Sequence, residues 1–199
     1  MSPPRPATKP LAPAAPSADA ASQADPERSR IAVDLVEDGG DWSGYRDIEA
    51  LVQAAAAAAS AHALVAARLP MVRNEAVVVL SSDDAVAALN GQYRGKPKPT
   101  NVLSFPAPAG TPAATIADAA ALGDIVLAAE TVHAEAAEGG IDPAHHLQHL
   151  VVHGVLHLVG FDHLTPAEAE SMEGIEIDIL ASLGVPNPYA GSEPDGADG

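Results

Sequence analysis

The sequence predicts a single domain of the α/β class, in which strands and helices alternate along the chain. The chain has 199 residues, of which 47% are hydrophobic, and this is enough for one domain with a core of its own. Short apolar runs rich in β-branched residues, such as residues 75–80, are typical of buried strands. Stretches with helix-start signals lie between these runs. No apolar run reaches the roughly 18 residues of a membrane-spanning helix, so we expect no membrane segment.

Four strands are expected, because four segments are short and apolar and are bounded by turn-forming residues. They are residues 31–36, 75–80, 101–105 and 122–129. The Ala-rich stretch 47–68 has high helix propensity and predicts the first helix. Ser81 or Ser82 is expected to cap a second helix that runs to about Tyr93. A third helix is expected to begin near Glu130.

The last two predicted helices have the strongest start signals. Asp142 precedes Pro143, which places a capping carboxylate before a proline at the first helical position. Thr165 and Glu168 are spaced as a capping box, and the helix that they open is expected to run to about residue 183.

The two ends of the chain differ in composition from the middle. Residues 1–28 are rich in Pro, Ala and Ser, with few large apolar side chains, so we expect a disordered tail. Residues 188–199 are Gly-rich and acidic, and we expect a flexible tail there as well. The folded domain is therefore predicted to span residues 29–187.

Composition also limits the location and the partners. The chain has no Cys, which excludes a disulfide framework and fits a cytoplasmic location. The net charge is −17, so bulk electrostatics disfavour a polyanionic partner. The basic residues are nevertheless clustered, because Arg94, Lys96 and Lys98 lie close together and no Lys or Arg follows them. If the protein binds a phosphate-containing ligand, we expect the ligand to bind at this loop.

The strongest functional pattern is a group of three histidines. His153 and His157 are four residues apart on a predicted helix, so both imidazoles project from one face. Gly160 can take positive φ and end the helix, after which His163 can turn back toward the other two rings. Three imidazoles with a fourth position left for water are typical of a catalytic zinc site. His149 and His157 are too far apart along the helix to bind one ion. His145 and His149 are therefore expected to be partly solvated residues one or two turns before the metal pair.

The same histidine spacing occurs in the extended motif of zinc peptidases, HExxHxxGxxH. In that motif a Glu after the first His is the general base, but here Gly154 occupies the position. A glycine within a helix costs about 1 kcal/mol relative to Ala, which indicates that another group approaches the backbone closely there. Met172 lies where a peptidase Met-turn would place a methionine, but the helical pattern around it predicts a core residue.

Four stretches together resemble a known family. They are HGVLHLVGFDH at 153–163, Leu89-Asn90 with YRGK at 93–96, PTNVLSFP at 99–106 and LGDIVL at 122–127. In these segments the chain resembles the YbeY family of bacterial metal-dependent endoribonucleases, over about residues 30–185.

The resemblance implies a compact α/β fold with one small mixed sheet flanked by helices. It also implies one zinc ion on His153, His157 and His163 and a functional arginine at Arg94. The implied activity is single-strand-specific RNA cleavage in ribosomal RNA maturation, including small-subunit rRNA ends, and in ribosome quality control. The implied partners are therefore single-stranded RNA and the small ribosomal subunit. A zinc peptidase and a non-catalytic ribosome-assembly factor are the alternative functions.

An arginine fork matches the charge that develops on the phosphoryl oxygens, which fits Arg94 as a catalytic residue. Lys96 and Lys98 are expected to attract the RNA backbone, although exposed lysines near a turn are also ordinary. Asp162 is either the partner of a ligand imidazole's second nitrogen or an ordinary turn residue. Asn101 and Ser104 could contact the ligand, but loop chemistry alone also explains them. The nucleophile, water or the 2′-hydroxyl of the RNA, is left open.

Overall fold

The fold is organised around one small mixed β-sheet. The computed structural model describes residues 30–108 and 119–190. The sheet has the order β1-β2-β4-β3, in which β1 (Ile31–Glu37), β2 (Arg73–Ser81) and β4 (Ala119–Ala128) run parallel. The edge strand β3 (Val102–Pro106) pairs antiparallel to β4. The predicted α/β fold with one small mixed sheet is thereby confirmed.

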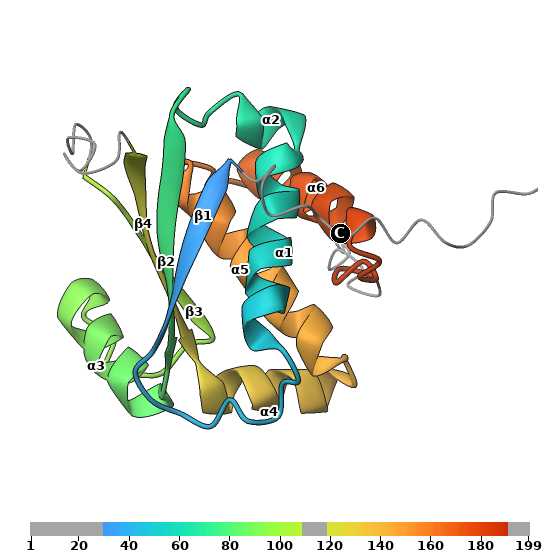
Figure 1. Cartoon of the computed structure of the whole chain (residues 1–199). Helices are drawn as coiled ribbons and strands as arrows, with labels where there is room; N and C mark the ends of the chain where they lie inside the picture. Colours follow the sequence, from blue (N-terminus) through green and yellow to red (C-terminus); the bar gives the residue numbers. More distant parts are fainter. Residues whose placement is uncertain (1–29, 109–118, 191–199) are drawn as a thin grey trace, which may run out of the picture.

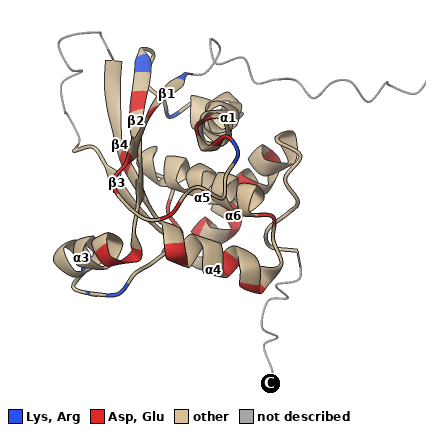
Figure 2. Ribbon diagram, turned by 60° about the horizontal axis from the view of Figure 1, so that its bottom comes forward, with Lys and Arg blue, Asp and Glu red and all other residues tan. Residues whose placement is uncertain are grey.

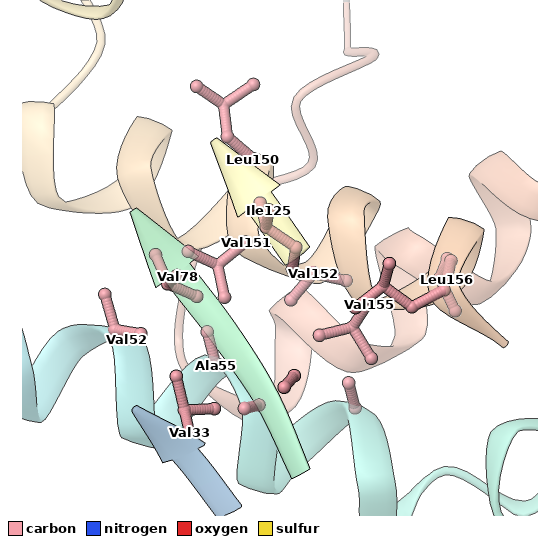
Figure 3. Packing of buried hydrophobic residues seen from close by; sticks show 14 of the residues in the cluster. Val33, Val52, Ala55, Val78, Ile125, Leu150, Val151, Val152, Val155 and Leu156 are labelled. Carbon is pink, nitrogen blue, oxygen red and sulfur yellow. The ribbon is translucent and has the colours of Figure 1, made fainter. Parts of the chain in front are cut away.

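The helices cover the two faces of the sheet unequally (Figure 1). α1 (Ile48–Ala61), α5 (Pro143–Leu158) and α6 (Pro166–Ser182) form the layer on one face. α3 (Asp83–Arg94) packs on the other face, and α4 (Ala129–Gly139) runs below one end of the sheet. The main core lies between the sheet and the larger helical layer, where Val78 and Ile125 meet α1 and α5 (Figure 3).

The predicted helix starts are present as capping interactions. The Asp142 side chain accepts a hydrogen bond from the backbone N–H of Ala144, and Pro143 is the first residue of α5. At the start of α6, Thr165 and Glu168 form a complete capping box. Ser82, the second of the two serines considered, caps α3.

Most strand ends differ from the prediction by one or two residues, and two elements differ more. The stretch predicted as one helix over 47–68 is interrupted, because His62 has the extended dihedrals φ −66° and ψ 132°. α1 ends before it, and the short α2 (Ala63–Ala66) follows. β4 begins at residue 119 rather than 122, because its pairing with β2 continues past a register shift.

The two ends of the chain can be compared only in part with the prediction. The predicted N-terminal tail, residues 1–28, lies outside the described residues, as do residues 191–199. Residues 188–190, assigned to the C-terminal tail, are described and form a turn next to α6. In the described parts of the chain, no helix is both long and apolar enough to cross a membrane.

Candidate metal centre

The last two turns of α5 carry the first two histidines and lie directly on the sheet. A Cβ atom built on Gly154 would lie 2.8 Å from Cδ1 and from Cγ2 of Ile125 on β4. The close approach that the sequence indicated at Gly154 is therefore made by Ile125. Position 154 faces the sheet, whereas the half-buried His153 and His157 lie on another side of the helix.

The turn after α5 brings back the third histidine. Gly160 has φ +81°, and its N–H donates to the carbonyl of His157. The N–H of Phe161 donates to the carbonyl of Leu156, which completes a Schellman motif. Arg68 holds this turn in place, since its Nη1 donates to the Gly160 carbonyl at 2.5 Å and its guanidinium lies 3.5 Å from the centre of the Phe161 ring.

The three imidazoles converge at the end of α5. One ligand nitrogen from each of His153, His157 and His163 lies within 4.8 Å of the others. The Nε2 atoms of His153 and His157 are 3.0 Å apart. Two nitrogens bound tetrahedrally to one zinc ion at about 2.05 Å would be roughly 3.3 Å apart, so this separation fits a shared ion. The structure therefore brings together the three residues that the spacing suggested.

Hydrogen bonds on the outer side of two rings define their tautomers. Nδ1 of His153 donates to Oε1 of Glu176 at 2.7 Å, and Nδ1 of His157 donates to the carbonyl oxygen of Phe161 at 3.1 Å. Each ring therefore presents an Nε2 lone pair to the other, a repulsive arrangement that a bound cation would relieve. Burial, followed by the nearby charges of His153 and His163, lowers the pKa of His157, which favours the neutral form that binds metals.

Glu176, a fully buried carboxylate on α6, was not among the residues predicted from the sequence. Burial alone would raise the pKa of Glu176, but hydrogen bonds from His149, His153 and Tyr189 outweigh it and lower this pKa to about 2. The Tyr189 hydroxyl donates to Oε2 of this carboxylate by a short hydrogen bond. One sequence signal could have identified Glu176, since it lies among the apolar residues Ile175 and Ile179 on the buried side of α6.

A cleft of about 660 Å³ opens in front of the three histidines. Arg94, which was predicted to lie in a loop, is the last residue of α3, and the basic loop with Lys96 and Lys98 follows it. The lining residues from the end of α3, this loop and the edge strand are Arg94, Thr100, Asn101, Val102, Ser104 and Pro106, and those from α5 and the turn are His153, His157, Gly160, Phe161, Asp162, His163 and Leu164. Arg94, the predicted catalytic residue, therefore faces the same cleft as the histidines. Ser104 and Asn101 also line it. Lys96 and Lys98 are exposed on the same loop but do not line the cleft.

Side-chain hydrogen bonds fix the two ends of the basic loop. The Asn90 amide on α3 donates to the Lys98 carbonyl at 2.8 Å. At the other end of the loop, the Asn101 amide donates to both carboxylate oxygens of Glu135 on α4, at 2.9 and 3.2 Å. His146 on α5 donates to the same carboxylate at 2.9 Å. The loop is thus connected to three helices.

The remaining residues singled out in the sequence have these positions. The Asp162 carboxylate accepts a hydrogen bond from the backbone N–H of His163, whereas the outer nitrogens of the other two rings bind Glu176 and Phe161. His149 is half-buried, with Nε2 3.4 Å from Oε2 of Glu176. Met172 is 2% exposed, as expected of a core residue.

Comparisons with known proteins identify relatives over most of the described chain. A family model described as endoribonuclease YbeY matches residues 43–184. A protein named endoribonuclease YbeY from Dinoroseobacter shibae is 44% identical over 173 residues, which cover 81% of this chain and 92% of that protein. One of the same name from Rhodopseudomonas palustris strain BisA53 is 51% identical over 151 residues, 75% of this chain and 84% of that protein.

Two further comparisons complete the findings. Against the relative of the same name from Rhodopseudomonas palustris strain BisB5, the chain is 56% identical over 120 residues, 58% of this chain, and spans 62% of that protein's length. The solution structure of a protein from Thermotoga maritima aligns with a TM-score of 0.47 at 24% identity, over 83% of this chain and 99% of that chain.

Proposed function

The chain belongs to the endoribonuclease YbeY family, and from this premise we propose that it is a zinc-dependent endoribonuclease that cleaves single-stranded RNA. The reaction is assigned to the cleft between the basic loop and the histidines. The proposed role is ribosomal RNA maturation in the cytoplasm, including small-subunit rRNA ends, together with ribosome quality control. The family match supports the activity, and the chemistry of the cleft supports the metal.

One observation carries the metal assignment. The Nε2 atoms of His153 and His157 face each other at 3.0 Å while both Nδ1 atoms donate elsewhere. A ligand set of neutral imidazoles suits zinc and other late first-row divalent ions, and among the described residues no fourth histidine or cysteine joins the three, which is typical of a catalytic site. His163, which is exposed, would complete the set.

The bound zinc would supply a Lewis acid that polarises the phosphoryl group and activates water. Arg94 would bind the non-bridging phosphate oxygens through its planar guanidinium as their charge increases. Lys96 and Lys98, on the same loop, would attract the RNA backbone. Figure 2 shows basic residues on the loop after α3 and acidic residues at the start of that helix.

Asp162 is proposed to act through its charge. Its carboxylate makes a backbone hydrogen bond, and its negative charge partly offsets the lowering of the pKa of His157. A carboxylate beside the histidines would therefore strengthen the binding of a divalent cation. Asn101 is proposed to keep the loop in place through Glu135.

The two alternative functions are not favoured. A zinc peptidase needs a general base after the first histidine, and position 154 packs against Ile125 on the sheet, where a Glu side chain would not fit. A non-catalytic assembly factor would have no need of an arginine in the cleft with an open three-histidine set.

The central experiment compares the purified Arg94→Ala variant with the purified wild type. We expect cleavage of labelled single-stranded RNA by the wild type and none of casein. Arg94→Ala should retain zinc and lose about 10²-fold or more in turnover. Arg73→Ala, which removes an exposed arginine outside the cleft, is the matched control and should cleave normally. Equal losses of zinc and activity in Arg94→Ala would contradict the assigned role.

The biological role requires a cellular test. In cells that lack the protein, we expect small-subunit rRNA ends to be extended. Wild type should restore the mature ends, and variants of His157 or Arg94 should not. Full restoration by a metal-free His163→Ala protein would favour the assembly factor instead.

A further inference from the structure

We propose that Glu176 and Tyr189 form a positioning layer behind the metal centre, which fixes the tautomer and orientation of His153. This inference rests on the proposed metal site and is independent of which RNA is cleaved. It extends the site beyond the three ligands and Arg94, to α6 and to the segment that follows it.

The layer begins with a carboxylate whose burial is costly. Glu176 is 0% exposed, and a buried charge is tolerated only where it is paired and hydrogen-bonded. Among the described residues, its ion-pair partners are histidines, His149 at 3.4 Å and His153 at 2.7 Å, and no Lys or Arg pairs with it. If Glu176 only filled space in the core, an apolar side chain of similar size would give the same or greater stability.

The consequence for His153 is a single tautomer. Because the ionised carboxylate can only accept, Nδ1 of His153 must carry the proton and Nε2 must present its lone pair to the cleft. The same contact limits rotation of the ring. Partners of this kind orient metal-binding histidines and make the ligand nitrogen more basic.

Tyr189 completes the layer from the end of the described chain. Its hydroxyl donates to the second oxygen of Glu176, and its ring packs edge-on against His149 with centroids 5.7 Å apart. The backbone N–H of Tyr189 donates to the side chain of Asn187 at 2.8 Å, which builds the turn that directs the tyrosine inward. With one oxygen held by Tyr189, the other remains directed at His153.

Behind the histidines, a second and smaller cavity of about 220 Å³ is lined by both residues of the layer. His153 and His163 form its boundary with the cleft, and Met172 forms part of its wall. Loss of either member of the layer would therefore leave His153 free to turn away from the cleft into this space.

The test compares Glu176→Leu, Glu176→Gln and Tyr189→Phe with two matched controls. Glu170→Gln removes an exposed carboxylate from the same helix. Tyr45→Phe removes a buried hydroxyl that has no hydrogen-bond partner in the described part of the chain. Zinc affinity is measured by chelator competition, and the tautomer of His153 by long-range ¹H–¹⁵N NMR of the metal-free protein. Thermal unfolding of each metal-free variant checks the fold.

We expect Glu176→Leu to bind zinc about 10- to 100-fold more weakly and to lose the single Nδ1–H tautomer of His153. Glu176→Gln, whose amide oxygen can still accept, should retain the tautomer and most of the affinity. Tyr189→Phe should lose affinity several-fold, and both controls should match wild type.

The proposal is overturned if Glu176→Leu is folded and matches wild type in zinc affinity and tautomer. If Glu176→Leu does not fold, the decision falls to Tyr189→Phe, and unchanged zinc affinity and ring signals in that variant overturn the proposal. Failure of the wild type itself to bind zinc would instead refute the proposed metal site. Normal zinc binding without RNA cleavage would refute the proposed activity alone.

Discussion

Replacing Gly154 by alanine tests the contact that places the histidines. The new methyl group would lie 2.8 Å from two carbons of Ile125 and 2.9 Å from a third, well inside the roughly 3.5–4.0 Å of an ordinary carbon contact. Ile125 is 0% exposed, so it has no solvent-facing space to move into. Overpacking of this kind costs about 1–3 kcal/mol, and the better helix propensity of alanine returns about 1 kcal/mol. We therefore expect a net loss of about 1 kcal/mol in the free energy of unfolding.

Urea denaturation of the metal-free protein measures this loss. The matched control is Gly174→Ala in α6, where a Cβ would meet nothing within 4 Å and alanine should stabilise the helix. The two substitutions are chemically identical, so their difference isolates the contact with Ile125. Because α5 would be pushed from the sheet, Gly154→Ala should also weaken zinc binding. If Gly154→Ala stabilised the protein as much as Gly174→Ala does, the packing argument would be refuted.

Two further predictions concern the metal centre. Arg68→Ala removes the hydrogen bond to Gly160 and the contact with the Phe161 ring, so His163 should be held less firmly and zinc affinity should fall about 10-fold in chelator competition. Unchanged affinity would contradict this. In acid, stability should fall as the pH drops from 4.5 toward 2, because the hydrogen bonds from the histidines and Tyr189 lower the pKa of Glu176 from its ordinary 4.5 to about 2 in the folded protein. The loss would reach about 3 kcal/mol in urea titrations, and an equally steep fall in Glu176→Gln would contradict it.

Protonation of His157 should lower the stability of the metal-free protein in a different pH range. The lowered pKa of His157 means that the folded metal-free protein binds fewer protons there than the unfolded chain. The contribution of His157 to the free energy of unfolding is therefore fully present above its ordinary pKa of 6.5 and decreases as the pH falls below that value. Bound zinc should remove this dependence over the range in which it outcompetes protons.

The parts of the site that could be predicted from the sequence are those fixed by local chemistry. A capping carboxylate and a proline act within one helical turn, which is why the start of α5 at Pro143 was predicted. The spacing of His153 and His157 is likewise a property of one helix, and the Gly160 turn is a property of the next few residues. A glycine within a helical pattern is also a local signal, so a close contact at Gly154 could be predicted, but its partner Ile125 could not.

The parts that could not be predicted depend on contacts between distant segments. Glu176 follows His153 by 23 residues and Arg68 precedes Gly160 by 92, so no local pattern relates either pair. Tyr189 was placed in a flexible tail because its neighbours are Gly and acidic residues, whereas its hydrogen bond to Glu176 and its ring contact with His149 tie it to the domain. The break at His62 lies in an Ala-rich stretch whose overall helix propensity is high, so the prediction of one uninterrupted helix was wrong.

The most demanding property of the proposed site is that it must hold RNA on a chain with a net charge of −17. If binding depends on the local loop, Arg94, Lys96 and Lys98 would displace at most three counterions, for a slope of roughly −2 in log affinity against log salt with single-stranded RNA. Replacing both lysines by Gln should reduce this slope by about 1.4, measured by fluorescence anisotropy between 50 and 200 mM salt. The control is the Arg46→Gln/Arg73→Gln variant, which changes net charge equally at exposed positions outside the loop. Equal effects of the two double variants would show that overall charge, and not the loop, governs RNA binding.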